Sequence, residues 1–186
     1  MEQSTEFAPV VQVDKDVIYP LVFTPQTIEA FWQRAKQFPT IYGTETLGDI
    51  NKFINLFFER LPDGQLIPYG LFWVMNPAQF TGVFYLTNMR EENGEFVDAN
   101  AHYTFFDKRH HGRVPLVKEM LKFWFEKYKF QRLSAEIPNY ATPQARHFAM
   151  ECGMRYEGKR RNSAKYKGEW FSTNLYGILR EEALNG

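Results

Sequence analysis

The chain of 186 residues has a single cysteine, Cys152, and no long uninterrupted apolar run. One cysteine excludes an internal disulfide framework and is typical of a reducing compartment, so we expect a cytoplasmic protein. Residues 1–16 are acidic and lack the apolar segment of a signal peptide. The densest apolar window, residues 66–75, is far too short to cross a membrane, so we expect no membrane partner.

The chain also lacks an excess of charge of either sign, with 22 Lys and Arg against 22 Asp and Glu. A balanced chain has no overall field to hold a polyanion, which disfavours nucleic acid as a partner and restricts any basic patch to a local role. The adjacent His110 and His111 diverge, and no third ligand has a suitable spacing. We therefore predict no metal site.

Aromatic residues are abundant, at 17% of the chain with 18 Phe, and apolar residues make up 44%. This apolar content is sufficient for a complete hydrophobic core and argues against disorder. The length indicates one domain. We expect a loose N-terminal arm over residues 1–16 and a single domain over residues 17–186.

The first half of the chain predicts two helices followed by strands. A short strand at 17–23 is interrupted by Pro20, which is typical of an edge strand. Apolar residues at helical spacing predict helices over 24–38 and 46–60, followed by a turn at 61–64. Short turn segments separate three β-rich runs, which predicts an antiparallel meander of strands at 69–76, 79–89 and 95–106.

The second half alternates helix and strand. We expect a helix over 114–130, a strand over 131–138, a helix from Asn139 or Thr142 to Cys152, and strands at 154–161 and 172–181 joined by a long polar loop. The crossover through the helix at 114–130 makes the strands on either side of it run parallel. The sequence thus predicts an α/β protein of the α+β type with a mixed, mostly antiparallel sheet.

A charged segment, Asp107 to Arg113, lies between a strand and the helix that follows it. The N-terminus of that helix presents free N–H groups and a positive dipole end, which favour an anion. Gly112 allows the backbone to approach an anion closely, and Arg109 and Arg113 add charge. Because neither GxxxxGK[ST] nor GxGxxG is present, we interpret the segment as another kind of diphosphate site held by backbone amides.

The residues RHHGRV, from Arg109 to Val114, resemble the Q/R-x-x-G-x-G/A signature of the GNAT acyl-CoA N-acyltransferases, with Val114 where that family has Gly or Ala. Further along, CGMRYEGKR (152–160) is similar to the family's LGF-x-x-EG-x-x-R. YKGEW (166–170) followed by LYGILR (175–180) is similar to the G-x-W…Y-x-L-x-R pattern of the branch that acetylates ribosomal-protein N-termini and related amines. About residues 70–182 match in order.

The resemblance implies a V-splayed mixed sheet with about four helices, and acetyl-CoA as cosubstrate without a metal. The acetyl-CoA would lie between the strand that ends at Phe106 and the strand at 131–137. The cofactor-binding residues that the resemblance implies are Arg109, His110, His111, Gly112, Arg113 and Val114 for the pyrophosphate, His102, Tyr103 and Thr104 for the pantetheine arm, and Asn139, or Thr142 in its place, after the second strand.

Direct transfer of an acetyl group needs a base for the amine and a proton for the leaving thiolate. Asp98, through its spacing to the charged segment, Glu136 on the facing strand, and His102, through its intrinsic pKa, are the candidate bases. The tyrosine that usually serves as the acid in this family, four residues before Gly153, is replaced by Ala149. Tyr140 is the candidate substitute.

These features predict an N-acetyltransferase, a monomer or homodimer, that moves an acetyl group from acetyl-CoA to a primary amine by direct attack in a ternary complex. The acceptor would be a protein N-terminus, a peptide or a small amine. The alternative is a degenerate module that binds acyl-CoA or has a structural role without catalysis, which Val114 and Ala149 favour. The cationic segment at 159–170 predicts an acidic acceptor, unless its charges only face solvent.

Overall fold

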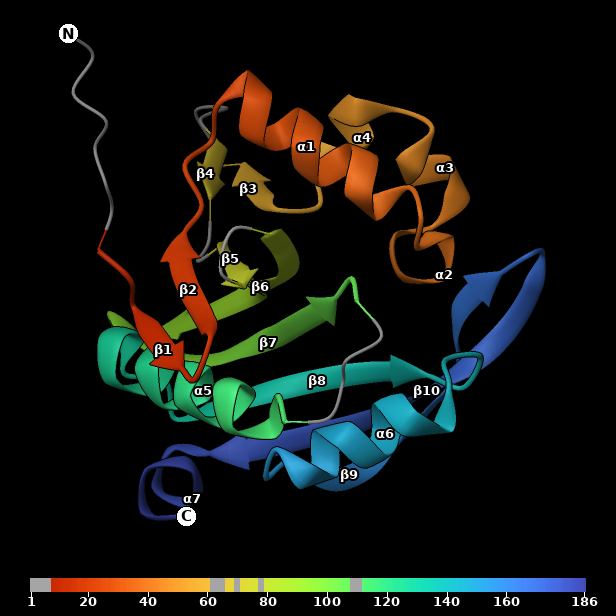
Figure 1. Cartoon of the computed structure of the whole chain (residues 1–186). Coiled ribbons are helices and arrows are strands. Elements are labelled where there is room, and N and C mark those ends of the chain that lie inside the picture. Colours follow the sequence, from red (N-terminus) through yellow and green to blue (C-terminus); the bar gives the residue numbers. More distant parts are fainter. Residues whose placement is uncertain (1–7, 61–65, 69–70, 77–78, 108–111) are drawn as a thin grey trace, which may run out of the picture.

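The structure, a computed structural model, describes residues 8–60, 66–68, 71–76, 79–107 and 112–186. An eight-stranded sheet with the order β1-β2-β5-β6-β7-β8-β10-β9 forms the middle of the molecule (Figure 1). Its strands are β1 (Val11–Val13), β2 (Asp16–Pro20), β5 (Phe72–Asn76), β6 (Gln79–Glu92), β7 (Glu95–Phe105), β8 (Arg132–Pro138), β9 (Arg155–Tyr166) and β10 (Glu169–Leu179). Two short strands, β3 (Phe58–Arg60) and β4 (Leu66–Pro68), pair separately. The predicted mixed, mostly antiparallel sheet is confirmed.

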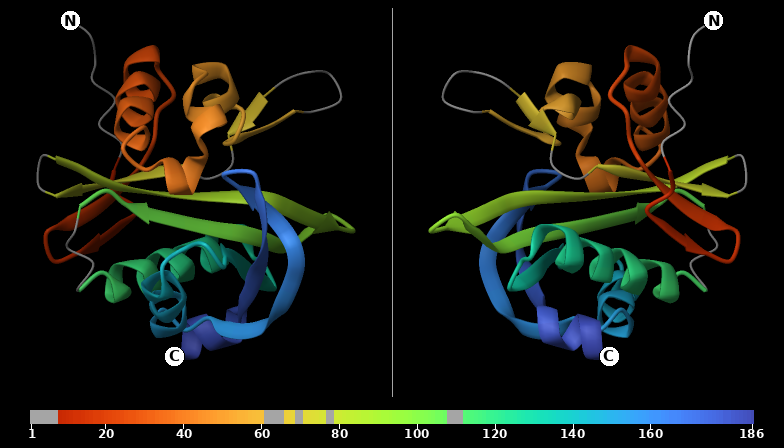
Figure 2. Two further views of the ribbon diagram at one scale, coloured as in Figure 1. Left: turned by 90° about the vertical axis from the view of Figure 1, so that its right-hand side faces the viewer. Right: turned by 90° about the vertical axis from the view of Figure 1, so that its left-hand side faces the viewer.

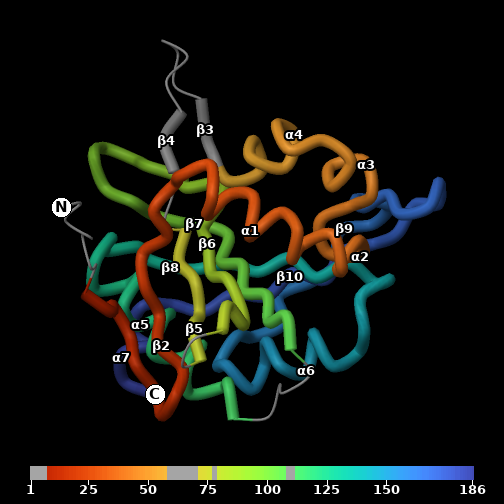
Figure 3. The backbone as a smooth tube through the Cα atoms, turned by 45° about the horizontal axis from the view of Figure 1, so that its top comes forward, coloured from red at the N-terminus to blue at the C-terminus, as the bar shows by residue number. Residues whose placement is uncertain are grey.

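Helices cover both faces of the sheet (Figure 2). One layer contains α1 (Pro25–Ala35), α2 (Pro39–Tyr42), α3 (Thr44–Leu47) and α4 (Ile50–Ile54), and the other contains α5 (Val114–Tyr128), α6 (Pro143–Glu151) and α7 (Arg180–Asn185). Seen from above the first layer, α1 crosses β6 and β7 (Figure 3). The described residues therefore form seven helices rather than about four, because short helices and the C-terminal α7 were not predicted.

The prediction of one continuous helix over 46–60 is wrong. Helix α3, which Gly43 separates from α2 with a φ of +77°, ends at Leu47 with Gly48 as its C-cap, and β3 occupies the last three residues of the predicted range. The Asp49 carboxylate then accepts hydrogen bonds from the N–H groups of Asn51 and Lys52, so it caps a new helix, α4. Leu47, Phe53 and Phe57 of the predicted apolar face are nevertheless buried, while Ile50 and Ile54 are partly buried. The periodicity identified the buried side of the segment but not the breaks in its backbone.

Both ends of the chain are more ordered than the sequence indicates. Within the predicted arm, β1 pairs with β2 and Val11 is buried. The predicted polar loop before β10 is instead a tight turn at Lys167 and Gly168, which have φ values of +50° and +86°. Positive φ at two successive residues matches the twist of a hairpin, so β9 and β10 continue to the turn. The predicted turn at 61–64 lies outside the described residues.

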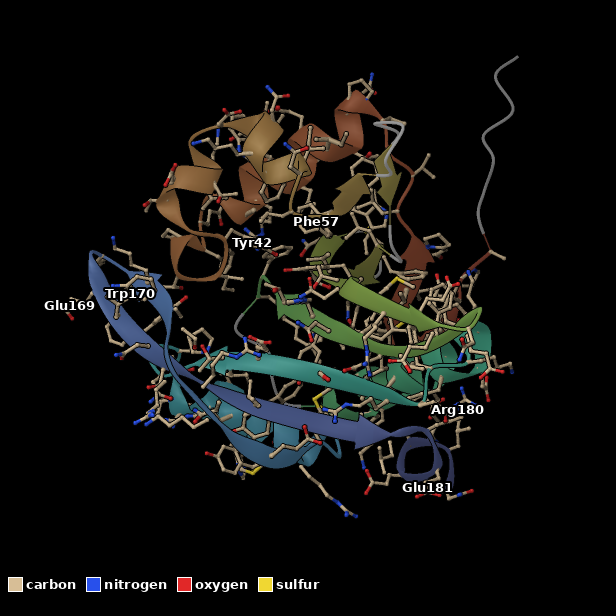
Figure 4. All side chains as sticks on the ribbon, turned by 180° about the vertical axis from the view of Figure 1, so that it is seen from behind. Tyr42, Phe57, Glu169, Trp170, Arg180 and Glu181 are labelled. Carbon is tan, nitrogen blue, oxygen red and sulfur yellow. The ribbon has the colours of Figure 1, made fainter. Side chains whose placement is uncertain are left out.

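Two separate cores hold the layers together. The larger core lies between the sheet and α5, α6 and α7, and Trp124 and Phe125 of α5 are fully buried in it. The second core lies under α1–α4 and is largely aromatic; Tyr42 and Phe57 belong to it (Figure 4). Among the described residues, none of the buried members of this second core comes from β8, β9 or β10. The face of these three strands on the side of α1–α4 is therefore left open.

The only parallel neighbours among the described strands are β7 and β8, as the crossover predicts, and they meet at one described pair, Asn100 and Ser134. Beyond this pair the two strands separate toward their carboxyl ends, at Phe105 and Pro138 (Figure 1). We call the resulting V-shaped opening the splay, and the end at Asn100 and Ser134 its root. The splay is where the antiparallel pairing of the sheet is interrupted, and a ligand is expected at such a point.

Gly82 of β6 supports the β7 wall of the splay. A Cβ added at Gly82 would lie 2.8 Å from the Thr104 carbonyl oxygen and 2.8 Å from Phe105 Cδ1. Because backbone cannot move aside easily, Gly82→Ala should lower the free energy of unfolding by about 1–3 kcal/mol in urea denaturation. Gly48→Ala is the matched control, since Gly48 has a φ of −75° and its nearest atoms would be 3.5 Å away. Equal stability of the two variants would contradict this packing.

Candidate functional site

The edge of β7 that faces the splay presents free backbone groups. The Phe106 N–H donates to the Thr81 carbonyl at 2.8 Å, and the register between β6 and β7 is regular from Gly82 to Tyr85. Because alternate residues of a strand bond to opposite neighbours, the N–H and C=O groups of Tyr103 and Phe105 point away from β6 and toward β8. Of the residues expected to contact a pantetheine arm, Tyr103 is thus the one whose backbone faces the splay, between His102 and Thr104, whose backbone groups face β6.

The charged segment before α5 is described only at its ends. Arg109, His110 and His111 lie outside the described residues. Gly112 has a φ of +91°, and a Cβ added there would meet no atom within 4 Å, so there is open space beside it. No side chain of the described residues caps the start of α5 at Arg113. Within the described part of the chain, the first N–H groups of α5, including that of Val114, are therefore not engaged by a capping side chain.

Arg113 is buried, with 3% of its surface exposed. Its Nη2 lies 2.9 Å from an Asp107 carboxylate oxygen and 3.7 Å from Asp16, and its guanidinium carbon lies 4.4 Å from the centre of the Phe105 ring. Nη1 has no hydrogen-bond partner among the described residues. The side chain therefore joins β2, the end of β7 and the start of α5.

Asp98 lies at the root of the splay and is held by β8. The Ser134 hydroxyl donates to Asp98 Oδ1 at 2.9 Å, and Arg132 Nε lies 3.6 Å from the same oxygen. Arg132 also pairs with Glu157 of β9 at 2.6 Å. This pair passes over Gly177 of β10, where a Cβ would lie 2.8 Å from Arg132 Nη2. Asp98 thus belongs to a network across β7, β8 and β9.

Glu136 lies two residues beyond Ser134, toward the open end of the splay. Leu133 and Ala135 are buried on the α5 side, so alternation directs Glu136 to the same open face as Ser134. Its carboxylate lies 3.0 Å from Arg160 Nη1 and remains partly exposed. Glu136 is the candidate base that stands beside the opening rather than at its root.

His102 faces the layer of α1–α4. Its ring stacks on Tyr85 with a centroid distance of 4.5 Å, and its Nε2 lies 2.8 Å from the Thr87 hydroxyl. Burial lowers the pKa of His102 to about 4, so the imidazole is neutral near pH 7. Held by Tyr85 and Thr87 beside the layer of α1–α4, His102 has an imidazole that is less basic than that of an ordinary histidine.

Asn139 and Tyr140 connect the end of β8 to the β9–β10 hairpin. The Asn139 amide oxygen accepts from Asn174 Nδ2 at 2.8 Å, and Tyr140 stacks on Tyr166 with a centroid distance of 4.6 Å. Burial, and to a lesser extent Tyr166, raises the pKa of Tyr140, which keeps its hydroxyl protonated. Helix α6 begins after Thr142, one of the two predicted starts.

Aromatic rings line the splay on the side of α6. Phe148 of α6 contacts Tyr103 and Phe105 at centroid distances of 5.7 and 6.2 Å. The neighbouring Ala149 is fully buried, and Cys152 is buried with a pKa raised to about 12, mainly by that burial. A thiol with this pKa is no nucleophile near pH 7, as expected for a packed cysteine.

Sequence reasoning missed the network around Arg132, Ser134 and Glu157. The signal was present, since polar residues alternate with apolar ones along β8 at Arg132, Ser134 and Glu136. Such alternation indicates one buried face and one accessible face. It did not indicate that Asp98 and Glu136 would lie at different depths of the splay, because depth depends on where the two strands separate.

Within the described ranges, no group of three or more His, Cys, Asp and Glu residues is arranged to hold a metal ion. None of the described helices is both long enough and apolar enough to span a membrane.

No protein-family model and no curated protein sequence matches the chain. Among solved structures, 225 chains match this one. One is the spermidine N-acetyltransferase from Vibrio cholerae in complex with CoA and spermine, with a TM-score of 0.71 and 16% identity over 92% of this chain and 99% of that one. Another is Mycobacterium smegmatis RimJ in complex with CoA-disulfide, at 0.67 and 17% over 90% and 83%. A third is the ribosomal-protein-S5-alanine acetyltransferase from Vibrio fischeri, at 0.68 and 11% over 92% and 96%.

The chain has the fold of the GNAT acetyltransferases, so the resemblance found in its motifs is confirmed at the level of the fold. An enzyme named for ribosomal-protein acetylation is among the similar structures, and so are spermidine acetyltransferases. Their identities to this chain are low, so they show its fold, and its chemistry depends on the residues of its own splay.

Substitution of Gly112 tests the anion site. Gly112→Asp would place a negative charge beside the N-terminus of α5, and binding of acetyl-CoA in calorimetry should weaken at least tenfold, about 1.4 kcal/mol. Gly94→Asp is the control, because Gly94 has a φ of +82° and an equally open surrounding in the β6–β7 turn. Unchanged affinity in folded Gly112→Asp protein would remove this loop from the site.

Arg113→Ala should destabilise the fold, because it removes a buried guanidinium that packs on Phe105 and lies against the carboxylates of Asp107 and Asp16. We expect a loss of about 3–5 kcal/mol in the free energy of unfolding, measured in urea. Arg90→Ala serves as the control, since its pair with Glu92 is exposed and should contribute little. A stable Arg113→Ala protein with weakened acetyl-CoA binding would instead assign the guanidinium to the phosphates.

Proposed function

We propose that the chain is an N-acetyltransferase that moves the acetyl group of acetyl-CoA to a primary amine by direct attack in a ternary complex. The observation that carries the proposal is the splay itself. Its β7 edge offers unpaired backbone groups at Tyr103 and Phe105, a carboxylate at Glu136 stands on the facing strand, and the N-terminus of α5 lies beside open space at Gly112.

The residues of the splay fit acetyl-CoA as a substrate. The amides around Gly112 and Val114 would hold the pyrophosphate, and the edge of β7 at Tyr103 and Phe105 would bond to the extended pantetheine arm as an added strand. A backbone N–H of this edge would also polarise the thioester carbonyl. The rings of Tyr103, Phe105 and Phe148 would exclude water on the side of α6.

In this reaction the amine nitrogen bonds to the acetyl carbon and the carbon–sulfur bond breaks. Glu136 takes the proton that the amine loses, directly or through a water molecule, because it lies at the open end of the splay and on its accessible face. Tyr140, in the loop that follows β8, supplies a proton to the thiolate, and the tyrosinate then regains a proton from solvent. Asp98 is the weaker candidate base, since it lies at the root of the splay, where Ser134 holds it, and not at the open end.

The acceptor would enter from the open face between α1–α4 and the β9–β10 hairpin. Solved structures of similar fold are named for spermidine and for a ribosomal protein, and both kinds of acceptor carry a primary amine. We propose a cytoplasmic monomer or homodimer with a protein N-terminus, a peptide or a small amine as acceptor. The alternative, a module that binds acyl-CoA without catalysis, is favoured by Ala149 at the position of the usual acid.

Glu136→Gln and Asp98→Asn form a matched pair, because each replaces a carboxylate of the splay by its amide. With an acceptor amine in excess and thiol release as the readout, Glu136→Gln should lower turnover about 10²–10⁴-fold across pH 6–9. Asp98→Asn should keep most of the turnover and lose stability instead, because it weakens the network at the root.

The reverse ranking would assign the base to Asp98. If both variants keep the turnover and pH profile of the parent chain, neither carboxylate is the base. If the parent chain binds acetyl-CoA but releases no thiol with any amine of a broad panel, the module without catalysis is the correct alternative.

A further inference from the structure

The β9–β10 hairpin concentrates positive charge in a chain that is neutral overall. Between residues 155 and 169 it carries six cationic side chains and two acidic ones, Glu157 and Glu169. The cationic residues are Arg155, Lys159, Arg160, Arg161, Lys165 and Lys167. A run of charge on a surface strand usually only faces solvent. Whether this one has a further role depends on where the hairpin lies and on the contacts that hold it there.

The hairpin extends past the end of β8 and stands at the mouth of the splay. Thr173 of β10 pairs with Pro138, the last residue of β8, so the segment 161–172 projects beyond the sheet. Its tip, marked by Glu169 and Trp170, rises toward the layer that contains Tyr42 (Figure 4). Arg160, at the base of this projection, lies 3.0 Å from Glu136. Arg160 therefore stands at the approach to the proposed base, and Arg161, Lys165 and Lys167 lie further along the same projection.

The projecting segment is anchored rather than loose. Tyr140, in the loop after β8, stacks on Tyr166 and meets Phe171 edge to face at 5.4 Å. The Asn139 N–H donates to the Ser172 carbonyl at 2.8 Å. These contacts connect both strands of the hairpin to the loop that ends the β8 wall of the splay, so the hairpin backbone has a fixed position relative to the opening.

Most of these cations have no acidic partner in the described part of the chain. Arg155 pairs with Glu182 and Arg160 with Glu136, whereas Lys159, Arg161, Lys165 and Lys167 make no ion pair with a described carboxylate. Lys165 Nζ lies 5.8 Å from the ring centre of Trp170, and Lys167 Nζ lies 5.4 Å from that of Tyr166. Trp170 is 61% exposed and offers an apolar surface between the charges.

We propose that this hairpin selects the acceptor, and that the acceptor is a polypeptide N-terminus with Asp or Glu within its first few residues. This inference depends on the proposed acetyl transfer, because it names the acceptor class of the same site. Carboxylates that follow the reacting amine would meet the cations at the mouth, and a peptide backbone would lie along Trp170. A polyamine brings further positive charges into the same place and is repelled.

The test uses the full chain and three peptides that share an N-terminal Ser and differ only at positions 2–4, with Glu, Gln or Lys there, together with spermidine. Thiol release gives kcat/KM at about 50 mM and 300 mM NaCl. We expect the acidic peptide to exceed the neutral one at least fivefold and the basic one and spermidine at least tenfold at low salt. The differences should shrink at high salt, because ions screen exposed charges.

A charge-reversal variant locates the effect. Lys165→Glu combined with Lys167→Glu should remove the preference for the acidic peptide. Lys122→Glu combined with Lys127→Glu changes the charge by the same amount on α5, away from the hairpin, and should keep the preference. A preference for spermidine or for the basic peptide, or ratios that ignore both salt and the hairpin variant, would overturn the proposal.

Direct binding separates this proposal from that of acetyl transfer. Fluorescence anisotropy of the same peptides, each labelled at its C-terminus, measures docking with CoA present and without turnover. Charge-dependent binding without thiol release would support the hairpin as the docking surface and refute the acetyl transfer. Thiol release with no dependence on peptide charge would support the acetyl transfer and refute selection by the hairpin. If there is neither charge-dependent binding nor thiol release, both proposals are refuted.

Discussion

The whole arrangement depends on one contact between the halves of the sheet, where β7 and β8 meet in parallel at Asn100 and Ser134. Parallel neighbours normally continue to pair along their length, and here they separate after this point. The bond from Ser134 to Asp98 and the proximity of Arg132 reinforce the contact from the open face. Without this root the two walls would be independent surfaces, and with a longer pairing there would be no opening between them.

The splay stays accessible because the two cores cover different parts of the sheet. Helix α5 packs its fully buried Trp124 and Phe125 under the sheet and closes one face of both halves. The aromatic core with Phe31 and Phe53 covers only the strands before β8 on the other face. One face is thus sealed across both halves and the other over a single half. This asymmetry leaves Glu136 accessible while its neighbours Leu133 and Ala135 are buried.

The sequence predicted the parts of the fold that depend on side-chain periodicity and on a single crossover. Helix α5, the meander before it and the parallel pairing of β7 and β8 followed from these rules alone. The breaks at Gly43 and Asp49 and the turn at Lys167 depend on backbone angles and capping, which a hydrophobic pattern does not record. For the same reason Asp98 and Glu136 could not be ranked, because their difference lies in their depth within the splay.

The absence of a side chain at Gly177 has a mechanical consequence. The bare backbone of β10 lets Arg132 of β8 reach across to Glu157 of β9, so the outermost strand is joined by charge to the third strand inward. Through Arg132 the same connection continues to Asp98 at the root. A force applied to the edge strand therefore has a lateral path to the vertex of the V that bypasses the hydrogen bonds of the intervening strand.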